Sequence, residues 1–279
     1  MALKNKDLIS IHDLSVGEVA TILDVSRKLK KKQKMGEPHE YLKGKTLAMI
    51  FSKASTRTRV SFETGFHQLG GHPIYMSEAT SQIGRGEPVK DTARVLSRFV
   101  DGIMIRTFHQ EEVESLASHS HIPVINGLTD FCHPCQVLAD LMTVREHKAV
   151  LEGLKMCYIG DGNNMANSLI VGGLKCGMEV SVACPAGYDP DPQVLAFAAS
   201  QPDFKFSLVR TPQEAAAGAD VVFTDVWASM GQEEERAVRA AAFAGYQVND
   251  RLMTLTNPGC MVQHCLPAHR GEEITAEVF

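Results

Sequence analysis

Short apolar runs alternate along this chain with segments whose apolar residues recur every three or four positions. The short runs predict buried strands, and the three-to-four spacing predicts amphipathic helices. In the first half, the expected strands lie at residues 46–51, 73–76, 102–106 and 123–126. The expected helices lie at residues 16–34, 56–69, 89–99 and 111–118, followed by a longer one at 133–147.

The alternation begins again after residue 150. The second series has expected strands at residues 155–159, 179–184, 205–209, 221–226 and 261–265, and helices at 166–176, 193–199, 211–218 and 233–242. Strands that alternate with helices favour parallel sheets covered on both faces. We therefore expect an α/β fold with two doubly wound parallel-sheet domains, residues 1–133 and 134–279, joined by interdomain helices. Ligands of such sheets bind beyond the carboxyl ends of the strands, where the polar motifs of this chain lie.

Composition excludes several classes of protein. With 44% hydrophobic and 22% charged residues over 279 positions, the chain is typical of a globular protein. Its net charge of −5 disfavours a surface for bulk nucleic acid, which is usually basic. We expect no membrane partner, because no apolar run has the length of a membrane span. The first residues lack the apolar core of a signal peptide, and seven cysteines, an odd number, indicate thiols in a reducing compartment. A cytoplasmic location is therefore expected.

Residues 55–59 read Ser-Thr-Arg-Thr-Arg, between a predicted strand and a predicted helix. The first turn of a helix offers N–H groups and the positive end of the dipole to an anion. The guanidinium fork of Arg57 suits the paired oxygens of a phosphate. Ser55 alone could be a simple N-cap, but capping needs neither arginine. The motif therefore predicts a pocket for a small phosphorylated substrate.

Arg106 ends the predicted strand at residues 102–106, where its side chain would enter the crevice beyond the sheet. The alternative for this arginine is a salt bridge at the edge of a domain.

Residues 132–136 read Cys-His-Pro-Cys-Gln and have three interpretations. Two cysteines at this spacing can form a thioredoxin-like redox pair or half of a zinc site. A redox pair would follow the first strand of its fold, and the cluster of His and Cys at residues 264–269 forms no recognised zinc pattern. The third interpretation suits the position better. Pro134 begins a helix, which leaves His133 and Gln136 at its exposed end as neutral hydrogen-bond donors.

Three motifs stand out in the second half. Residues 160–165, Gly-Asp-Gly-Asn-Asn-Met, resemble a dinucleotide fingerprint, but Met165 stands where a third glycine is needed. The adjacent amides of that helix start would instead suit a carboxylate. Asp225 ends a predicted strand and suits a substrate ammonium, while Trp227 beside it could simply pack in the core. Cys265 ends the last predicted strand; it could be an inert buried thiol, and no base is evidently paired with it to make it a nucleophile.

Taken together, these motifs resemble the ornithine carbamoyltransferases over nearly the whole chain. The resemblance rests on SKASTRTRVSFE, the loop at Gln82, Arg106, NGLTDFCHPCQVLAD, GDGNNMANS, TDVWASMGQE and HCLPAHRGEE. The STRTR and HPxQ motifs alone would suit the wider superfamily, including the aspartate enzymes. The segment at residues 225–231, Asp-Val-Trp-Ala-Ser-Met-Gly, narrows the resemblance to ornithine.

The resemblance implies a first domain for carbamoyl phosphate, a second domain for L-ornithine, and a homotrimer with active sites at the subunit interfaces. It assigns the phosphate to Ser55, Thr56, Arg57 and Thr58. It assigns the carbamoyl group to Arg106, His133 and Gln136, with Gln82 reaching the site of a neighbouring subunit. It assigns the ornithine backbone and amine to Asn164, Asp225, Ser229 and Met230, and the lining of the reacting centre to Cys265 and Leu266.

The implied reaction is attack by the side-chain amine of ornithine on the carbonyl carbon of carbamoyl phosphate, which gives citrulline and phosphate. Preorganised donors such as Thr58, Arg106 and His133 would stabilise charge on the carbonyl oxygen, and Arg57 charge on the phosphate. The two domains would bring the substrates together by closing. No metal, cofactor or covalent intermediate is expected. The residues leave open whether the enzyme serves arginine biosynthesis or, in reverse, arginine breakdown.

Two alternatives remain open beside this interpretation. The chain could carbamoylate another amine such as aspartate, or it could be a non-catalytic relative. The family pattern continues into a C-terminal helix with an arginine that contacts carbamoyl phosphate, and the sequence ends at Phe279 before it. The expectation from that comparison is a phosphate site with one donor fewer.

Overall fold

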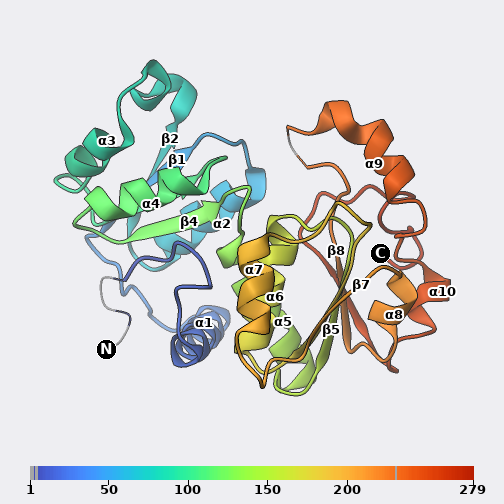
Figure 1. Cartoon of the computed structure of the whole chain (residues 1–279). Helices are drawn as coiled ribbons and strands as arrows, with labels where there is room; N and C mark the ends of the chain where they lie inside the picture. Colours follow the sequence, from blue (N-terminus) through green and yellow to red (C-terminus); the bar gives the residue numbers. More distant parts are fainter. Residues whose placement is uncertain (1–2, 4–5, 230) are drawn as a thin grey trace. The chain divides into compact units, whose positions relative to one another are not determined.

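The computed structural model describes residues 3, 6–229 and 231–279 and divides into two compact units, Met1–Cys135 and Gln136–Phe279. The first unit contains α1 (Val16–Lys34), β1 (Thr46–Phe51), α2 (Thr56–Gln68), β2 (His72–Ser77), η1 (Glu78–Thr80), η2 (Ile83–Arg85), α3 (Val89–Leu96), β3 (Gly102–Arg106), α4 (Gln110–His119) and β4 (Val124–Leu128). Helix α5 (Pro134–Lys148) begins at the end of this unit and continues into the second (Figure 1).

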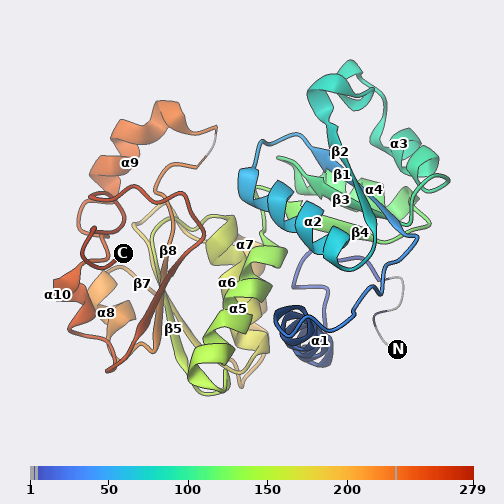
Figure 2. The same cartoon turned by 180° about the vertical axis from the view of Figure 1, so that it is seen from behind.

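The first unit is built on a parallel four-stranded sheet in the order β2-β1-β3-β4. Successive side chains of a strand point to opposite faces, and β1 shows the result. Ala48 and Ile50 pack with buried residues of α3 and α4. Met49 and Phe51 pack with Phe62 of α2 on the other face. Helix α4 accordingly lies in front of the sheet in Figure 1, and α2 lies in front of it in Figure 2.

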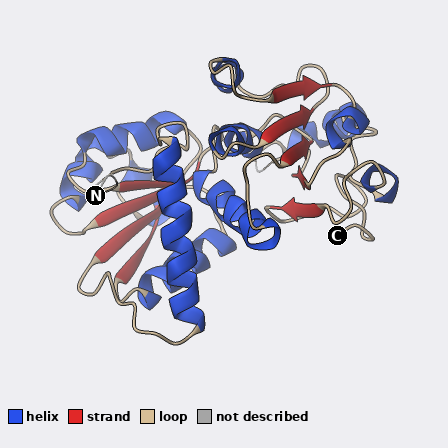
Figure 3. Cartoon of the chain, turned by 90° about the horizontal axis from the view of Figure 1, so that it is seen from below, coloured by secondary structure: helices blue, strands red, loops and turns tan. Residues whose placement is uncertain are grey.

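The second unit is built on a parallel five-stranded sheet in the order β7-β6-β5-β8-β9. Its strands are β5 (Lys155–Ile159), β6 (Glu179–Ala183), β7 (Phe206–Val209), β8 (Val221–Thr224) and β9 (Met261–His264). Its helices after α5 are α6 (Asn164–Lys175), α7 (Pro192–Ala199), α8 (Pro212–Ala216), η3 (Glu233–Glu235), α9 (Arg236–Ala242) and α10 (Asp250–Met253). Figure 3 shows the strands of both sheets in red and the helices around them in blue.

Helix α6 is buried along almost its whole length, and Gly173 explains how it approaches the sheet so closely. A Cβ atom at Gly173 would lie 2.3 Å from Cε of Met156 and 2.9 Å from Cγ2 of Val180. On the other face, Cys157 and Ile159 of β5 pack in a cluster with the alanines of α8 and with Phe243. The sheet therefore has helices on both faces, and the predicted α/β fold with two parallel sheets is confirmed.

The strand orders create a switch point in each sheet. In the first unit the chain runs outward from β1 in one direction and from β3 in the other, so a crevice is expected at their carboxyl ends. In the second unit the corresponding pair is β5 and β8. The motifs that follow these four strands are therefore the ones positioned for a ligand.

Two local predictions need correction. Residues 233–242 form a 3-10 turn and then the shorter helix α9, and α10 was not predicted at all.

Among the described residues, no helix has the length and apolar character needed to cross a bilayer.

Candidate active site

The junction between β1 and α2 contributes the first group of site residues. Ser55 is the N-cap of α2, and its hydroxyl accepts a hydrogen bond from the backbone N–H of Thr58 at 3.1 Å. The capping interpretation is therefore correct for Ser55. The side chains of Thr56 and Arg57 are exposed on the first turn of α2. That turn combines backbone amides with a guanidinium, which are donors suited to an anion.

Arg106 lies beside this junction because β1 and β3 pair in parallel, with Phe51 opposite Arg106. The backbone carbonyl of Arg106 accepts a hydrogen bond from Ser52 N–H at 2.9 Å, which ties the loop to β3. Its side chain is 8% exposed, and Nη1 donates to Oγ1 of Thr58 at 3.2 Å. Two residues separated by almost fifty positions therefore meet at the first switch point.

His133 lies within the electrostatic reach of Arg106. Burial, and then the Arg106 guanidinium, lower the pKa of His133 from its usual 6.5 to about 3. The imidazole is therefore neutral at physiological pH and can donate a hydrogen bond without carrying charge. Because folding lowers this pKa, protonation favours the unfolded state, and the stability contributed by neutral His133 is lost as the pH falls from about 6.5 towards 3.

The cysteines on either side of His133 are structural. Burial raises the pKa of Cys132 and of Cys135 to about 12, so neither provides the reactive thiolate that a redox pair requires. Sγ of Cys135 donates to the backbone carbonyl of Asn126 at 3.4 Å. Pro134 is the first residue of α5, as predicted. The helix-start interpretation of this segment therefore fits best.

Gln136 and Gln82 are placed differently from the residues above. Gln136 belongs to the second unit, and its Nε2 donates to Oδ1 of Asp140 one helical turn later, at 2.8 Å. Burial raises the pKa of that Asp140 carboxyl to about 7. Gln82 is exposed just before η2. Its role towards a neighbouring subunit stays a prediction.

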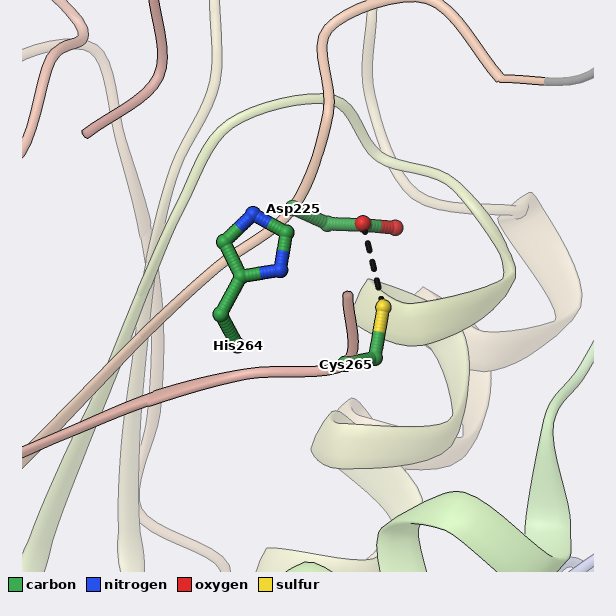
Figure 4. Close-up of side chains that lie close together, drawn as sticks. All are labelled: Asp225, His264 and Cys265. Atoms are coloured by element: carbon green, nitrogen blue, oxygen red, sulfur yellow. Dashed lines mark hydrogen bonds between the residues drawn. The ribbon is translucent and has the colours of Figure 1, made fainter. Parts of the chain in front are cut away.

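Asp225 is the centre of the second group of site residues. It directly follows β8 and is 6% exposed. Its Oδ2 accepts a hydrogen bond from Nδ2 of Asn163 at 2.9 Å. Its Oδ1 accepts from Sγ of Cys265 at 3.1 Å, the contact drawn in Figure 4, and from the N–H of Val226 at 2.9 Å. A thiol that donates this bond is protonated, which disfavours a nucleophilic role for Cys265.

His264 supports the residues that follow it. The N–H of Leu266 donates to Nδ1 of His264 at 2.9 Å, and Nε2 lies 3.0 Å from Oε1 of Glu273. The tautomer protonated on Nε2 satisfies both contacts. They hold Leu266 in a left-handed conformation with φ of 63°, which is uncommon for a residue with a side chain.

Two groups among the described residues could offer three ligand atoms to a metal ion. One comprises Asp225, His264 and Cys265, with ligand atoms within 4.8 Å of one another (Figure 4), and the other His269, Glu272 and Glu273. In the first group both ring nitrogens of His264 already have partners. A metal there would have to displace one of them.

Gly162 has a structural explanation other than nucleotide binding. A Cβ atom at Gly162 would lie 2.3 Å from the backbone carbon of Asp189. The chain itself therefore occupies the space beside Gly162. Asn163 caps α6, and Asn164 is its first residue, partly buried.

Ser229 lies in the segment after β8. Its N–H donates to Oε1 of Gln232 at 3.0 Å. Met230, the other predicted ornithine contact here, lies outside the described residues. Trp227 is buried and stacks on Phe243 with ring centres 5.8 Å apart, which confirms the core-packing alternative for this residue.

Arg239 of α9 is a site-supporting residue that the sequence did not reveal. Its Nη1 donates to Oδ2 of Asp161 at 2.8 Å and to the carbonyl of Trp227 at 3.0 Å, and its Nε donates to Oε2 of Glu235 at 2.8 Å. It thereby ties the loop after β5 to the segment after β8. No local pattern indicates this, because the partners come from distant parts of the chain.

Replacing Arg239 with methionine should lower the free energy of unfolding by about 3 kcal/mol, because the buried carboxyl of Asp161 would lose its charged hydrogen-bond partner. Fluorescence of Trp227, the only tryptophan, would follow urea unfolding. The matched control is Arg236→Met, whose ion pair with Glu272 is more exposed and should cost less than about 1 kcal/mol. Equal losses in the two variants would contradict the assignment.

Similarity to known proteins agrees with this geometry. Residues 6–146 match the family model described as aspartate/ornithine carbamoyltransferase, carbamoyl-P binding domain. Residues 152–279 match the model of the Asp/Orn binding domain. The ornithine carbamoyltransferase of Geobacter sulfurreducens is 54% identical over 98% of this chain and 90% of its own length. That of Syntrophotalea carbinolica is 57% identical with the same coverage.

A solved structure gives the same result in three dimensions. The ornithine carbamoyltransferase from Pyrococcus furiosus superposes with a TM-score of 0.95 at 50% identity, covering 99% of this chain and 89% of that one. Two family models together span most of the chain, and relatives of more than half identity cover nearly all of it. The chain belongs to the aspartate/ornithine carbamoyltransferase family.

Proposed function

We propose that this chain transfers the carbamoyl group of carbamoyl phosphate to the side-chain amine of L-ornithine, giving L-citrulline and phosphate. The family models assign it a carbamoyl-phosphate domain and an Asp/Orn domain. Ornithine is favoured over aspartate because relatives of 54–57% identity are named ornithine carbamoyltransferases. The segment at residues 225–231 agrees with that choice.

The first unit binds carbamoyl phosphate in this proposal. The observation that supports it best is the hydrogen bond between Arg106 and Thr58, which joins the helix start to the end of β3. The first turn of α2 and Arg57 would hold the phosphate. Arg106, Thr58 and neutral His133 would donate to the carbonyl oxygen, where negative charge develops as the amine attacks.

The second unit binds ornithine in the same proposal. Asp225 would accept from an ammonium group of the substrate, and Asn164, Ser229 and Met230 would contact the amino-acid backbone. Cys265 and Leu266 would line the reacting centre, with Gln136 as a further contact of the carbamoyl group. The bond from Cys265 to Asp225 supports this grouping, because it brings the ends of β8 and β9 together.

The direct test is citrulline formation by the purified protein with carbamoyl phosphate and a panel of amines. Ornithine should be the preferred acceptor. Carbamoyl aspartate as the main product would favour the alternative acceptor, and no product at high concentrations of both substrates would favour a non-catalytic relative.

The pH profile offers a separate prediction. A lysine-like amine has a pKa of about 10.4, so most ornithine carries a protonated side chain at neutral pH. Since only the neutral amine attacks, kcat/KM for ornithine should rise steadily from pH 7 to mildly alkaline values. His133 should contribute no break near pH 6.5, because its pKa lies at about 3. A flat profile over this range would rule out attack by the minor neutral form.

The proposal also includes a homotrimer, in which Gln82 contributes to the active site of a neighbouring subunit. The enzyme would act in the cytoplasm. The exposure of Gln82 supports a role outside its own unit. Light scattering should give a mass three times that of the chain. Two inactive variants, Gln82→Ala and Arg106→Met, should regain part of the activity when their subunits are mixed, since some sites would receive both native residues. A monomer, or mixing without recovery, would contradict a shared site.

A further inference from the structure

The side chain of Asn163 makes four hydrogen bonds to described residues of the second unit. Its Oδ1 accepts from the N–H groups of Met165 and Ala166, at 2.9 and 3.2 Å, and from the hydroxyl of Tyr158 at 3.3 Å. Its Nδ2 donates to Oδ2 of Asp225 at 2.9 Å. The first two bonds are those of an ordinary N-cap. The bond to Asp225 has no part in capping.

The orientation of this amide is determined by its surroundings. Oδ1 faces three donors, two of which are backbone N–H groups that cannot accept a hydrogen bond. Reversing the amide would set its NH₂ against them and its oxygen against the carboxylate. The helix cap therefore directs Nδ2 at Asp225.

Asp225 lies close to other acidic groups. After burial, its charge contributes to the raised pKa of Asp140 in α5 and of Asp161 in the loop after β5, so these carboxylates repel one another when ionised. Burial, and then the charges of Asp225 and Asp161, raise the pKa of the Tyr158 hydroxyl, which therefore stays protonated and neutral. Cys265 and His264 face Asp225 from the end of β9. Cys265 donates a hydrogen bond to Oδ1 of Asp225, and Asn163 donates one to Oδ2.

We propose that Asn163 is a positioning residue for the amino-acid substrate, which fixes the rotation of the Asp225 carboxylate that receives the substrate's ammonium group. This inference rests on the proposed function of Asp225. Asn163 acts through Asp225, so its contribution should appear in the kinetics of ornithine and not in those of carbamoyl phosphate.

Asn163→Asp separates this role from capping. Aspartate caps a helix as well as asparagine does, so the cap is kept, and any fall in the unfolding temperature would report the repulsion between the two carboxylates. The second carboxylate would face Asp225 in place of a donor, and kcat/KM for ornithine should fall about a hundredfold. KM for carbamoyl phosphate should change less than about twofold. Asn163→Ser, which keeps a capping oxygen and removes the donor without adding charge, should give a smaller loss of about tenfold.

A double-mutant cycle with Asp225→Asn tests the coupling. The double variant exchanges the two side chains and restores one donor opposite one carboxylate. It should therefore be no less active than Asp225→Asn alone, so that the hundredfold loss disappears in that background. Losses that multiply, or an Asn163→Asp enzyme with wild-type ornithine kinetics, would overturn the assignment while leaving the proposed function intact. A wild-type protein that forms no citrulline would overturn both.

Discussion

Replacing Arg106 with methionine should lower kcat/KM for carbamoyl phosphate by about a thousandfold. The side chain is buried at the end of β3, and its hydrogen bond to Thr58 already orients it. Little further free energy is therefore needed to orient it towards the charge that develops in the transition state. Removing it also removes a positive charge beside His133. Steady-state citrulline formation with each substrate varied in turn would measure the loss.

Two further variants make the Arg106 result specific. Arg106→Lys keeps the charge but not the planar fork, and most of the loss should remain. Arg94→Met removes an exposed arginine from α3 in the same unit, whose partner is Asp91 at 3.5 Å, and should change the rate less than about twofold. If Arg106→Met kept its kcat/KM for carbamoyl phosphate, Arg106 would not be the donor to the carbamoyl oxygen.

Replacing Asp225 with asparagine should lower kcat/KM for ornithine by about a thousandfold, most of it through KM. The change removes one charge at nearly constant volume. It also sets an amide against Nδ2 of Asn163 and Sγ of Cys265, both of which donate to the native carboxylate. The substrate's ammonium would then lose its anionic partner in a buried site.

The control for Asp225 is Asp250→Asn at the start of α10, an exposed carboxylate in the same unit. It should leave ornithine kinetics within about twofold, because a charge at the surface is screened. A loss of less than tenfold in Asp225→Asn would contradict a direct contact between this carboxylate and the substrate.

The site could be predicted only in part, and the Cys-His-Pro-Cys-Gln segment shows why. From the sequence it had three interpretations, because spacing alone does not reveal whether a thiol is buried. In the structure Cys132 is buried and Cys135 partly buried, and burial raises the pKa of both thiols to about 12, so they stay protonated. The two neighbouring asparagines show that a residue's role can depend on a partner far away in the sequence. The family resemblance assigns Asn164 to ornithine, whereas nothing in the sequence indicates the role of Asn163, because its partner Asp225 lies 62 residues away.

The pattern of apolar residues by itself determined the α/β class, the order of the strands along the chain and the motifs at their ends, because buried parallel strands read as short apolar runs and helices repeat every three to four residues. It missed the four-residue α10 and mistook residues 233–235 for helix, since such short segments carry little local preference. Only the tertiary structure decided which strands are neighbours. That pairing placed Arg106 beside Thr58, Asp225 between Asn163 and Cys265, and Arg239 against Asp161. These contacts join residues far apart in the chain, and no periodicity in the sequence encodes them.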